Sequence, residues 1–296
     1  MKVIVFGAGE YGRRYCQEYG SSVQVIAFAD NSSEKQKEKY LGHVVIDPKD
    51  IILYDYDKIV IAIYDYNDKG SKIVSEILEK LHMLGVEHSK IAIAALAPYP
   101  SFHPNRIEFL RKFSEIFYED SKEDGVIAEC GVLRGHYSAY MNMLFPDKKL
   151  YLFDTFKGFD NRDLETEKNV NTKPVESSNP YMKIGNADIA LLRCPHPDKV
   201  VIKEGYIPDT FAGMEDKRFL FVHLDMDLYQ PTLAALRFFL PRIVQGGVIL
   251  LHDYYCPWYT GVKEAVKEFT KEASFTYMPI GDDLSIAIIP SKDSRL

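Results

Sequence analysis

The sequence predicts an α/β protein with two Rossmann-like domains in series. Short β-branched runs alternate with amphipathic segments along the chain, which is typical of parallel strands joined by crossover helices. Each half also opens with a strand that leads into a glycine turn, at residues 2–12 and 126–135. Pro98, Pro100 and Pro104 interrupt the pattern between the halves. We therefore expect domains at residues 1–97 and 106–296, joined by a linker at 98–105.

The first half reads as a small α/β unit that ends in a short strand. Apolar runs predict strands, and apolar residues at helical spacing predict helices. The predicted strands cover residues 2–6, 23–29, 58–63 and 91–95, and the predicted helices cover 11–19 and 69–84.

The second half repeats this alternation after a helix at residues 106–118. Strands are expected at 126–130, 150–153, 200–204, 219–224, 248–251, 275–278 and 285–289, and helices at 136–143, 187–192, 231–240 and 262–271. Residues 158–183 are polar and poor in large apolar groups. We expect a long loop there, of the kind that closes over a site or stays disordered.

Composition narrows the classes of function. The chain has 296 residues and a formal net charge of -7, so it lacks the basic surface that draws proteins to nucleic acid. It has no apolar run long enough to span a bilayer. The four cysteines stand far apart in the sequence, which indicates reduced thiols in a cytoplasmic protein.

Gly7, Gly9 and Gly12 form a GxGxxG turn between the first strand and the first helix. Such a turn lets backbone N–H groups approach a phosphate, and Asp30 ends the next strand, where a ribose-binding carboxylate is expected. The motif predicts binding of a nucleotide or nucleotide-sugar. A turn that serves only tight packing is the alternative, and no partner for hydride transfer stands out.

A second glycine turn, ECGVLRG, contains Glu129, Gly131 and Gly135 and lacks the phosphate-binding spacing. S-adenosylmethionine has no phosphate, and its ammonium, sulfonium and ribose hydroxyls favour an acidic residue beside an open backbone. Asp154 ends the next strand and can accept hydrogen bonds from both ribose hydroxyls. We therefore expect this cofactor here, with a purely structural turn as the alternative.

Acidic residues also follow two later strands. Asp225 and Asp227 follow the strand that contains His223, and His252 and Asp253 follow the strand after it. Carboxylates brought together at neighbouring strand ends favour a cation between them, and oxygen ligands suit Mg²⁺. Asp227 and Asp253 also precede helices and could cap them instead. His223 is expected to pack in or beside its strand, whereas His252 could be a ligand, a base or a neighbour.

Five blocks together resemble the macrocin O-methyltransferase (TylF/MycF) family over residues 105–296: AECGVLRG, LFDTFKGF, KEGYIPDTF, HLDMDLYQPT and GGVILLHDYY. The resemblance implies a class I methyltransferase fold with a seven-stranded sheet, and Mg²⁺-dependent methylation of sugar hydroxyls.

By the same resemblance, Glu129, Gly131 and Asp154 match cofactor-binding positions. Asp225 matches the first metal carboxylate and general base, and Asp253 matches the second metal carboxylate. The macrolide members have Asp-Asp where this chain has His252-Asp253, which puts the role of residue 252 in doubt.

The N-terminal motifs GAGEYGRRY and FADN resemble the nucleotide-binding domains of sugar acyltransferases and related polysaccharide-biosynthesis proteins. The whole pattern predicts an enzyme that methylates a sugar hydroxyl of a glycan, nucleotide-sugar or glycosylated metabolite. Because related enzymes commonly assemble, the resemblance also implies a homo-oligomer. Two rivals stay open at this point: an NAD(P)-dependent oxidoreductase, and a non-catalytic nucleotide-sugar-binding protein.

Overall fold

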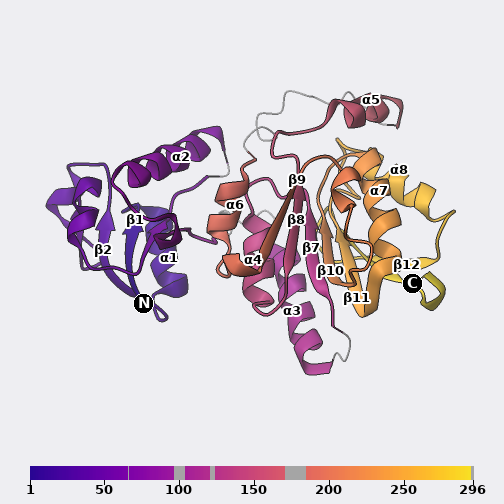
Figure 1. Ribbon diagram of the computed structural model, residues 1–296, viewed down its shortest axis with the longest axis horizontal. Coiled ribbons are helices and arrows are strands. Elements are labelled where there is room, and N and C mark those ends of the chain that lie inside the picture. The colour runs from indigo at the N-terminus through magenta and orange to yellow at the C-terminus, as the bar shows by residue number, and fades with distance from the viewer. Residues whose placement is uncertain (66, 97–103, 121–123, 171–184, 295–296) are drawn as a thin grey trace. The chain divides into compact units, whose positions relative to one another are not determined.

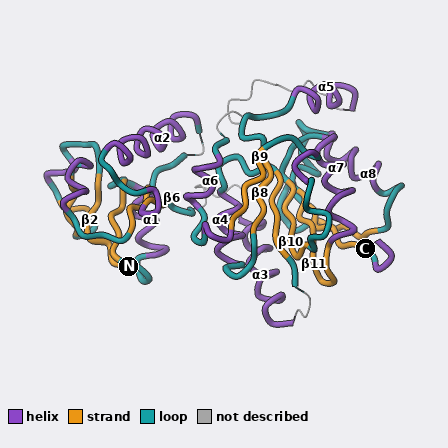
Figure 2. The backbone as a smooth tube through the Cα atoms, viewed as in Figure 1, coloured by secondary structure: helices purple, strands orange, loops and turns teal. Residues whose placement is uncertain are grey.

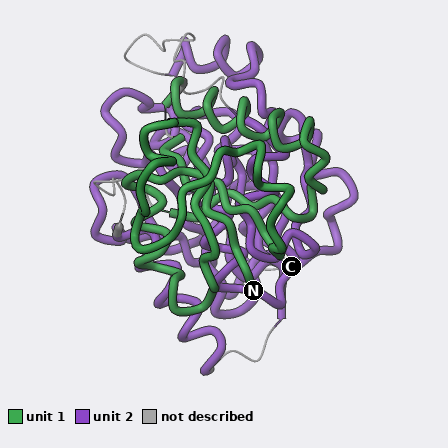
Figure 3. Tube along the Cα trace, turned by 90° about the vertical axis from the view of Figure 1, so that its left-hand side faces the viewer, with its two compact units in different colours: residues 1–100 green, residues 101–296 purple. Residues whose placement is uncertain are grey.

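A computed structural model describes residues 1–65, 67–96, 104–120, 124–170 and 185–294 of the chain. The chain splits into two compact units, Met1–Pro100 and Ser101–Leu296 (Figure 3). Both units are mixed α/β structures, which confirms the predicted fold class (Figure 1). Most of the predicted linker 98–105 lies outside the described residues, and helix α3 begins at Pro104.

The first unit contains a six-stranded sheet in the order β3-β4-β2-β1-β5-β6. Its strands are β1 (Lys2–Phe6), β2 (Gln24–Ala29), β3 (Lys39–Tyr40), β4 (His43–Ile46), β5 (Lys58–Ile61) and β6 (Ile91–Ile93), and its helices are α1 (Glu10–Tyr19) and α2 (Asp68–Met83). The β3–β4 hairpin was not predicted, because its strands are only two and four residues long. Leu41 and Gly42 join them with positive φ angles of 49° and 83°, as two-residue hairpin turns require.

The second unit contains a seven-stranded sheet in the order β12-β13-β11-β10-β7-β8-β9. Its strands are β7 (Val126–Cys130), β8 (Leu150–Asp154), β9 (Val200–Glu204), β10 (Phe219–Leu224), β11 (Ile243–Leu251), β12 (Phe275–Pro279) and β13 (Ile286–Pro290). Six strands run in one direction, and β13, which pairs antiparallel with both β11 and β12, runs in the other. Figure 2 shows the strands as one continuous twisted layer.

Helices cover both faces of this second sheet. α3 (Pro104–Asp120), α4 (His136–Leu144) and α6 (Ala187–Arg193) lie on one face, and α7 (Tyr229–Phe239) and α8 (Gly261–Phe269) lie on the other (Figure 1). The core between the sheet and α7 and α8 contains a cluster of buried phenylalanines that includes Phe153, Phe219 and Phe239. No helix in the described part of the chain is both long and apolar enough to cross a membrane.

The prediction of an uninterrupted loop at 158–183 was wrong for its first part. Residues Asn161–Val170 form helix α5, which packs against α7 and α8. The buried face of α5 contains Asp163 and Glu167, four residues apart, so the helix has no apolar periodicity to reveal it. The rest of the predicted loop, residues 171–183, lies outside the described residues.

Candidate active site

Four neighbouring strands of the second sheet end at the same level. In the paired register, Leu251 of β11 lies opposite Leu224 of β10, Leu224 opposite Cys130 of β7, and Cys130 opposite Phe153 of β8. The next residue along each strand is therefore part of one row at the carboxyl edge of the sheet, where open α/β sheets form their sites. That row consists of His252, Asp225, Gly131 and Asp154.

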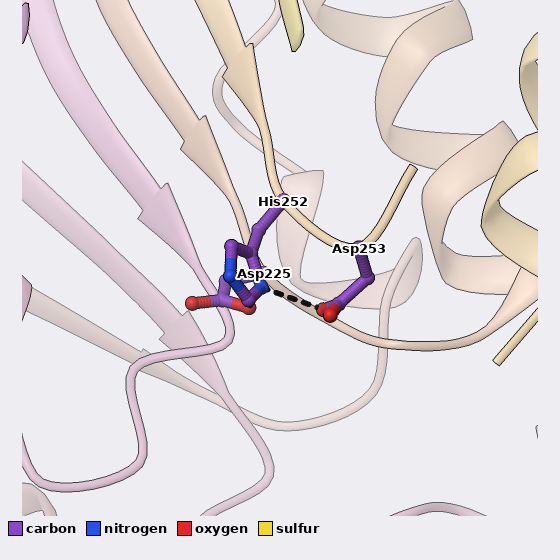
Figure 4. Close-up of side chains that lie close together, drawn as sticks. All are labelled: Asp225, His252 and Asp253. Atoms are coloured by element: carbon purple, nitrogen blue, oxygen red, sulfur yellow. Dashed lines mark hydrogen bonds and ion pairs between the residues drawn. The ribbon is translucent and has the colours of Figure 1, made fainter. Parts of the chain in front are cut away.

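Asp225, His252 and Asp253 form one cluster (Figure 4). The His252 Nδ1 atom lies 2.8 Å from Asp225 Oδ1 and 2.8 Å from Asp253 Oδ2. One ligand atom from each residue lies within 4.8 Å of the others, a spacing that a single cation can bridge. The expected proximity of Asp225 and Asp253 is thus present, and His252 lies between them.

The charges in this cluster depend on each other. Burial by itself would lower the pKa of His252, but the attraction of Asp225 and then of Asp253 outweighs it and raises that pKa to about 10. Burial opposes ionisation of Asp225, yet His252 and Arg106 hold the pKa of its carboxyl well below the usual range. The pair is therefore an aspartate beside an imidazolium at neutral pH.

Asp227 lies beside the cluster and does not cap a helix. Helix α7 begins at Tyr229, and its N-cap position is occupied by Leu228 and not by Asp227. Burial, together with the charges of Asp253 and Asp225, raises the pKa of Asp227, whose side chain is hydrogen-bonded to Asp253. Asp253 is also no cap, because α8 begins only at Gly261. The capping alternative for both aspartates was therefore wrong.

A buried chain of polar side chains connects Asp225 to Glu129 on strand β7. The Arg106 guanidinium donates to Asp225 Oδ2 at 2.9 Å, and the same nitrogen lies 3.3 Å from His223 Nε2. His223 Nδ1 lies 3.0 Å from Glu129 Oε1, and Ser138 donates to the other oxygen of Glu129. Burial raises the pKa of Glu129, which is 2% exposed. The Glu129 carboxyl group therefore faces this chain, and its predicted contact with the cofactor stays a prediction.

Arg106 was not foreseen from the sequence. It lies on α3, 119 residues before Asp225, and no motif surrounds it. His223 does lie within its strand as expected, but its ring is also hydrogen-bonded on both sides.

The glycine turn after β7 packs against the strand that bears Asp225. Gly131 has a φ of 85°, and a Cβ atom added there would lie 1.9 Å from the Asp225 carbonyl oxygen. Gly135 has a φ of 73°, and its added Cβ would lie 2.7 Å from the Cα of Ala190. Both positions therefore require glycine.

The Asp154 carboxylate holds this turn in place. Its Oδ2 accepts hydrogen bonds from the backbone N–H groups of Val132 at 2.6 Å and Leu133 at 2.8 Å, and its Oδ1 accepts one from Phe156 at 2.7 Å. A carboxylate has further lone pairs, so the predicted ribose contact stays open as a prediction.

A cavity of about 590 Å³ lies next to Asp154, between the segments that follow β8 and β9. The guanidinium of Arg162 lies 3.5 Å from the centre of the Tyr206 ring, so a cation and an aromatic face meet on its wall. The cavity is lined by Thr155, Lys157, Gly158, Phe159, Asp160, Asn161, Arg162, Glu204, Gly205 and Tyr206.

The first unit has a comparable turn. Asp30 Oδ2 accepts a hydrogen bond from the backbone N–H of Ala8 at 3.0 Å and pairs with Lys35 at 2.8 Å. A Cβ atom added at Gly12 would lie 2.1 Å from the Gly7 carbonyl oxygen, whereas one added at Gly9 would meet only the Lys35 Nζ atom, at 3.9 Å. Gly12 thus serves packing, and the backbone at Gly9 is open.

Comparison with known proteins decides the family of the second unit. The macrocin O-methyltransferase (TylF) family model matches residues 102–282. The chain belongs to the macrocin O-methyltransferase family. Residues 1–92 match a different model, described as C2185-like, N-terminal. That match does not name the sugar acyltransferases, so the predicted resemblance to them remains a prediction.

One curated relative in this family is 26% identical over 147 residues, which are 44% of this chain and 53% of the relative. It is the 8-demethyl-8-(2,3-dimethoxy-α-L-rhamnosyl)-tetracenomycin-C 4′-O-methyltransferase of Streptomyces olivaceus. The chain thus spans about half the length of that relative.

Two solved structures share the fold. The O-methyltransferase NovP is 18% identical with a TM-score of 0.53, over 64% of this chain and 80% of NovP. The calicheamicin methyltransferase CalS11 is 17% identical with a TM-score of 0.50, over 78% of this chain and 96% of CalS11. These likenesses confirm the predicted class I methyltransferase fold.

Proposed function

We propose that this chain is an S-adenosylmethionine-dependent O-methyltransferase that methylates a hydroxyl group of a sugar on a glycosylated small molecule. The observation that carries the proposal is that His252, Asp225, Gly131 and Asp154 lie in one row at the carboxyl edge of the sheet. This sheet belongs to the part of the chain that matches the methyltransferase family. The curated relative, whose name describes 4′-O-methylation of a rhamnosyl product, supports a sugar hydroxyl as the acceptor.

S-adenosylmethionine supplies an electrophilic methyl group on its sulfonium. In this proposal its methionine end lies at the turn from Gly131 to Gly135, beside Glu129, and its ribose lies at Asp154. Both glycines let the turn pack closely, Gly131 against the backbone of Asp225 and Gly135 against that of Ala190, and this packing fixes the turn beside the row of strand ends. The cavity beyond Asp154 offers the apolar and polar groups that a bound nucleoside needs.

The donor set of Asp225, His252 and Asp253 fits a divalent cation. It offers two carboxylate oxygens and, once His252 has given up its extra proton, an imidazole nitrogen, all within 4.8 Å of one another. Mg²⁺ accepts a small number of protein ligands because it keeps several waters. When bound, such a cation would lower the pKa of a coordinated sugar hydroxyl.

The chain's own residues position the acceptor and receive its proton. Asp225 Oδ1 faces His252 at the edge of the sheet, so it can accept a hydrogen bond from a hydroxyl group placed there and receive its proton. The charges of His252 and Arg106, which lower the pKa of Asp225, make it a weak base, so this step relies on a hydroxyl whose own pKa has been lowered. His252 is the alternative base when it is neutral. Most of the rate gain would come from alignment of that hydroxyl with the methyl group and from the fixed charges around it.

Methyl transfer tests the proposal directly. The full chain is incubated with S-adenosylmethionine and a panel of rhamnosylated small molecules and nucleotide-sugars, and products are detected by mass as added methyl groups. We expect at least one sugar acceptor to gain a methyl group, and Asp225→Asn to slow that transfer at least about 100-fold. Asp216→Asn, an exposed aspartate in a turn, is the control. Equal rates for Asp225→Asn and wild type would refute the assigned role.

We further propose that the first unit binds a nucleotide or nucleotide-sugar at Gly9. The open backbone at Gly9, next to Asp30 and Lys35, is the observation that favours it. Gly9→Ala should leave stability unchanged and weaken binding of a UDP-sugar, measured by calorimetry on the full chain. Tighter binding of NAD(P) than of any nucleotide-sugar would favour the oxidoreductase alternative, and no binding at all would indicate a turn that serves only packing.

A further inference from the structure

Arg106 is a buried cation inside the candidate active site. It is 8% exposed and lies near the start of α3, two residues after Pro104. Its guanidinium is held by contacts from several elements: 2.9 Å to Asp225 Oδ2, 3.3 Å to His223 Nε2, and 5.6 Å to the centre of the Tyr137 ring. The Tyr137 ring in turn lies 4.0 Å from the His223 ring, so the guanidinium has little freedom to move away.

The two oxygens of Asp225 therefore have different partners. Oδ2 accepts from Arg106, and Oδ1 faces His252 Nδ1 at 2.8 Å. Only Oδ1 points toward the ligand set that includes Asp253. A cation held by this set would use one oxygen of Asp225 and would lie close to a second, permanent positive charge, because an arginine side chain stays protonated in proteins.

We propose that Arg106 is a positioning residue that acts as a built-in counter-charge of Asp225 and weakens divalent-cation binding at the Asp225, His252 and Asp253 cluster. This inference rests on the proposed function only in assigning the cluster to a methyl-transfer site. The formal charges explain the effect. Asp225 and Asp253 attract the cation, and His252 must be neutral to act as a ligand. The Arg106 charge stays 2.9 Å from Asp225 in that state too and offsets its carboxylate, in a setting where buried charges are screened less than at the surface.

The consequence is a site that keeps its shape without a metal ion and takes one up only weakly. Asp225 stays fixed because Arg106 donates to its Oδ2, whether or not a cation is bound at Oδ1. We expect the dissociation constant for Mn²⁺ or Mg²⁺ to be about 10⁻⁴ M or weaker in the absence of cofactor and acceptor, since the cation has few protein ligands and a cationic neighbour.

Cation binding is measured on the full chain without S-adenosylmethionine or acceptor, with Mn²⁺ as the probe and electron paramagnetic resonance of free Mn²⁺ as the readout. Arg106→Gln removes the charge, and Arg106→Lys keeps it. Arg111→Gln is the matched control, because Arg111 lies on the same helix and pairs only with exposed Glu108 and Glu115 among the described residues.

We expect Arg106→Gln to bind Mn²⁺ at least about tenfold more tightly than wild type, a difference of about 1.4 kcal/mol. Arg106→Lys should stay within about threefold of wild type, and Arg111→Gln should match wild type. Equal or weaker binding by Arg106→Gln would overturn the inference, as would the absence of Mn²⁺ binding in every variant.

A wild-type measurement keeps the inference testable if Arg106→Gln does not fold. If the dissociation constant is about 10⁻⁴ M or weaker, 1 mM Mn²⁺ is at most about ten times the dissociation constant. Binding then raises the free energy of unfolding only a little, so the melting temperature should shift only slightly. A dissociation constant below about 10⁻⁵ M for wild type would overturn the inference.

The outcome also separates this inference from the proposed function, because no methyl transfer is measured. If the variants bind Mn²⁺ in the predicted order but the protein transfers no methyl group, the proposed enzymatic function is refuted and the inference about Arg106 stands.

Discussion

Glu167 offers the sharpest test of how the structure holds its active-site segments in place. Its side chain is fully buried on α5, and its Oε2 accepts a hydrogen bond from the backbone N–H of Tyr229 at 2.7 Å. Burial raises the pKa of this carboxyl group, and the backbone N–H groups of Tyr229 and Gly261 offset part of that rise, so the carboxylate also lies close to Gly261. Tyr229 and Gly261 begin α7 and α8, neither of which has a side-chain cap of its own. One carboxylate therefore caps α7 and lies against the start of α8, and these helices follow the segments that carry Asp225 and Asp253.

The expected energies follow from these contacts. Glu167→Ala leaves the Tyr229 N–H at the start of α7 without its acceptor, so we expect a loss of about 1 to 2 kcal/mol. Gly261→Ala places a Cβ atom 2.2 Å from Glu167 Oε1, and such overpacking costs about 1 to 3 kcal/mol. In the double variant the clashing carboxylate is absent, so Gly261→Ala should then cost close to nothing.

Hydrogen exchange is measured by mass spectrometry on peptides that contain residues 229 and 261, in wild type, in the two single variants and in the double variant. It gives the free energy of local opening at each helix start. We expect a coupling energy of about 1 to 3 kcal/mol between the two substitutions. Glu165→Ala is the control, because Glu165 is exposed on the same helix and pairs with Lys168. Additive effects, or an unchanged exchange rate at the start of α7 in Glu167→Ala, would contradict the interpretation that Glu167 holds both helix starts in place.

Two further predictions concern single sites. Burial raises the pKa of Asp163 from 3.8 to about 6, so the folded state binds this proton more tightly than the unfolded chain and loses stability as the pH rises from about 4 to about 6. Asp163→Asn keeps an oxygen that accepts from the Tyr206 hydroxyl but does not titrate. In urea unfolding it should flatten the pH dependence of the free energy of unfolding and raise that free energy by up to about 3 kcal/mol at pH 7. An unchanged pH dependence would contradict the prediction. Gly12→Ala should destabilise the first unit by at least about 2 kcal/mol in the same assay, because its Cβ would overlap the Gly7 carbonyl; unchanged stability would contradict that packing.

The strand ends were predictable because two sequence signals coincide there. A short β-branched run marks a buried parallel strand, and an acidic residue directly after it has to emerge at the carboxyl edge. Asp154 and Asp225 satisfy both conditions with respect to the predicted strands, and Asp253 follows its strand with one residue, His252, in between. What the pattern could not supply is the order of the strands, which decides that Asp225 and His252 become neighbours at 2.8 Å.

Other parts of the site had no signal in the sequence. Arg106 reaches Asp225 through tertiary packing of α3. Helix α5 was missed because its buried side chains are acids that bond to distant groups, and periodicity detects only apolar faces. Asp227 resembled a helix cap because it precedes α7 by two residues, yet its backbone is left-handed, with φ of 63°, and its carboxyl group bonds to Asp253.

The central claim is that the turn after β7 binds the cofactor, and calorimetric titration of the full chain with S-adenosylhomocysteine tests it most directly. Gly131→Ala and Gly213→Ala form a matched pair, since both glycines have positive φ, at 85° and 78°, but only Gly131 has backbone within 2 Å of its added Cβ. We predict that wild type and Gly213→Ala bind alike and that Gly131→Ala loses at least about tenfold in affinity. Absence of binding by wild type, or equal binding by all three proteins, would contradict the claim.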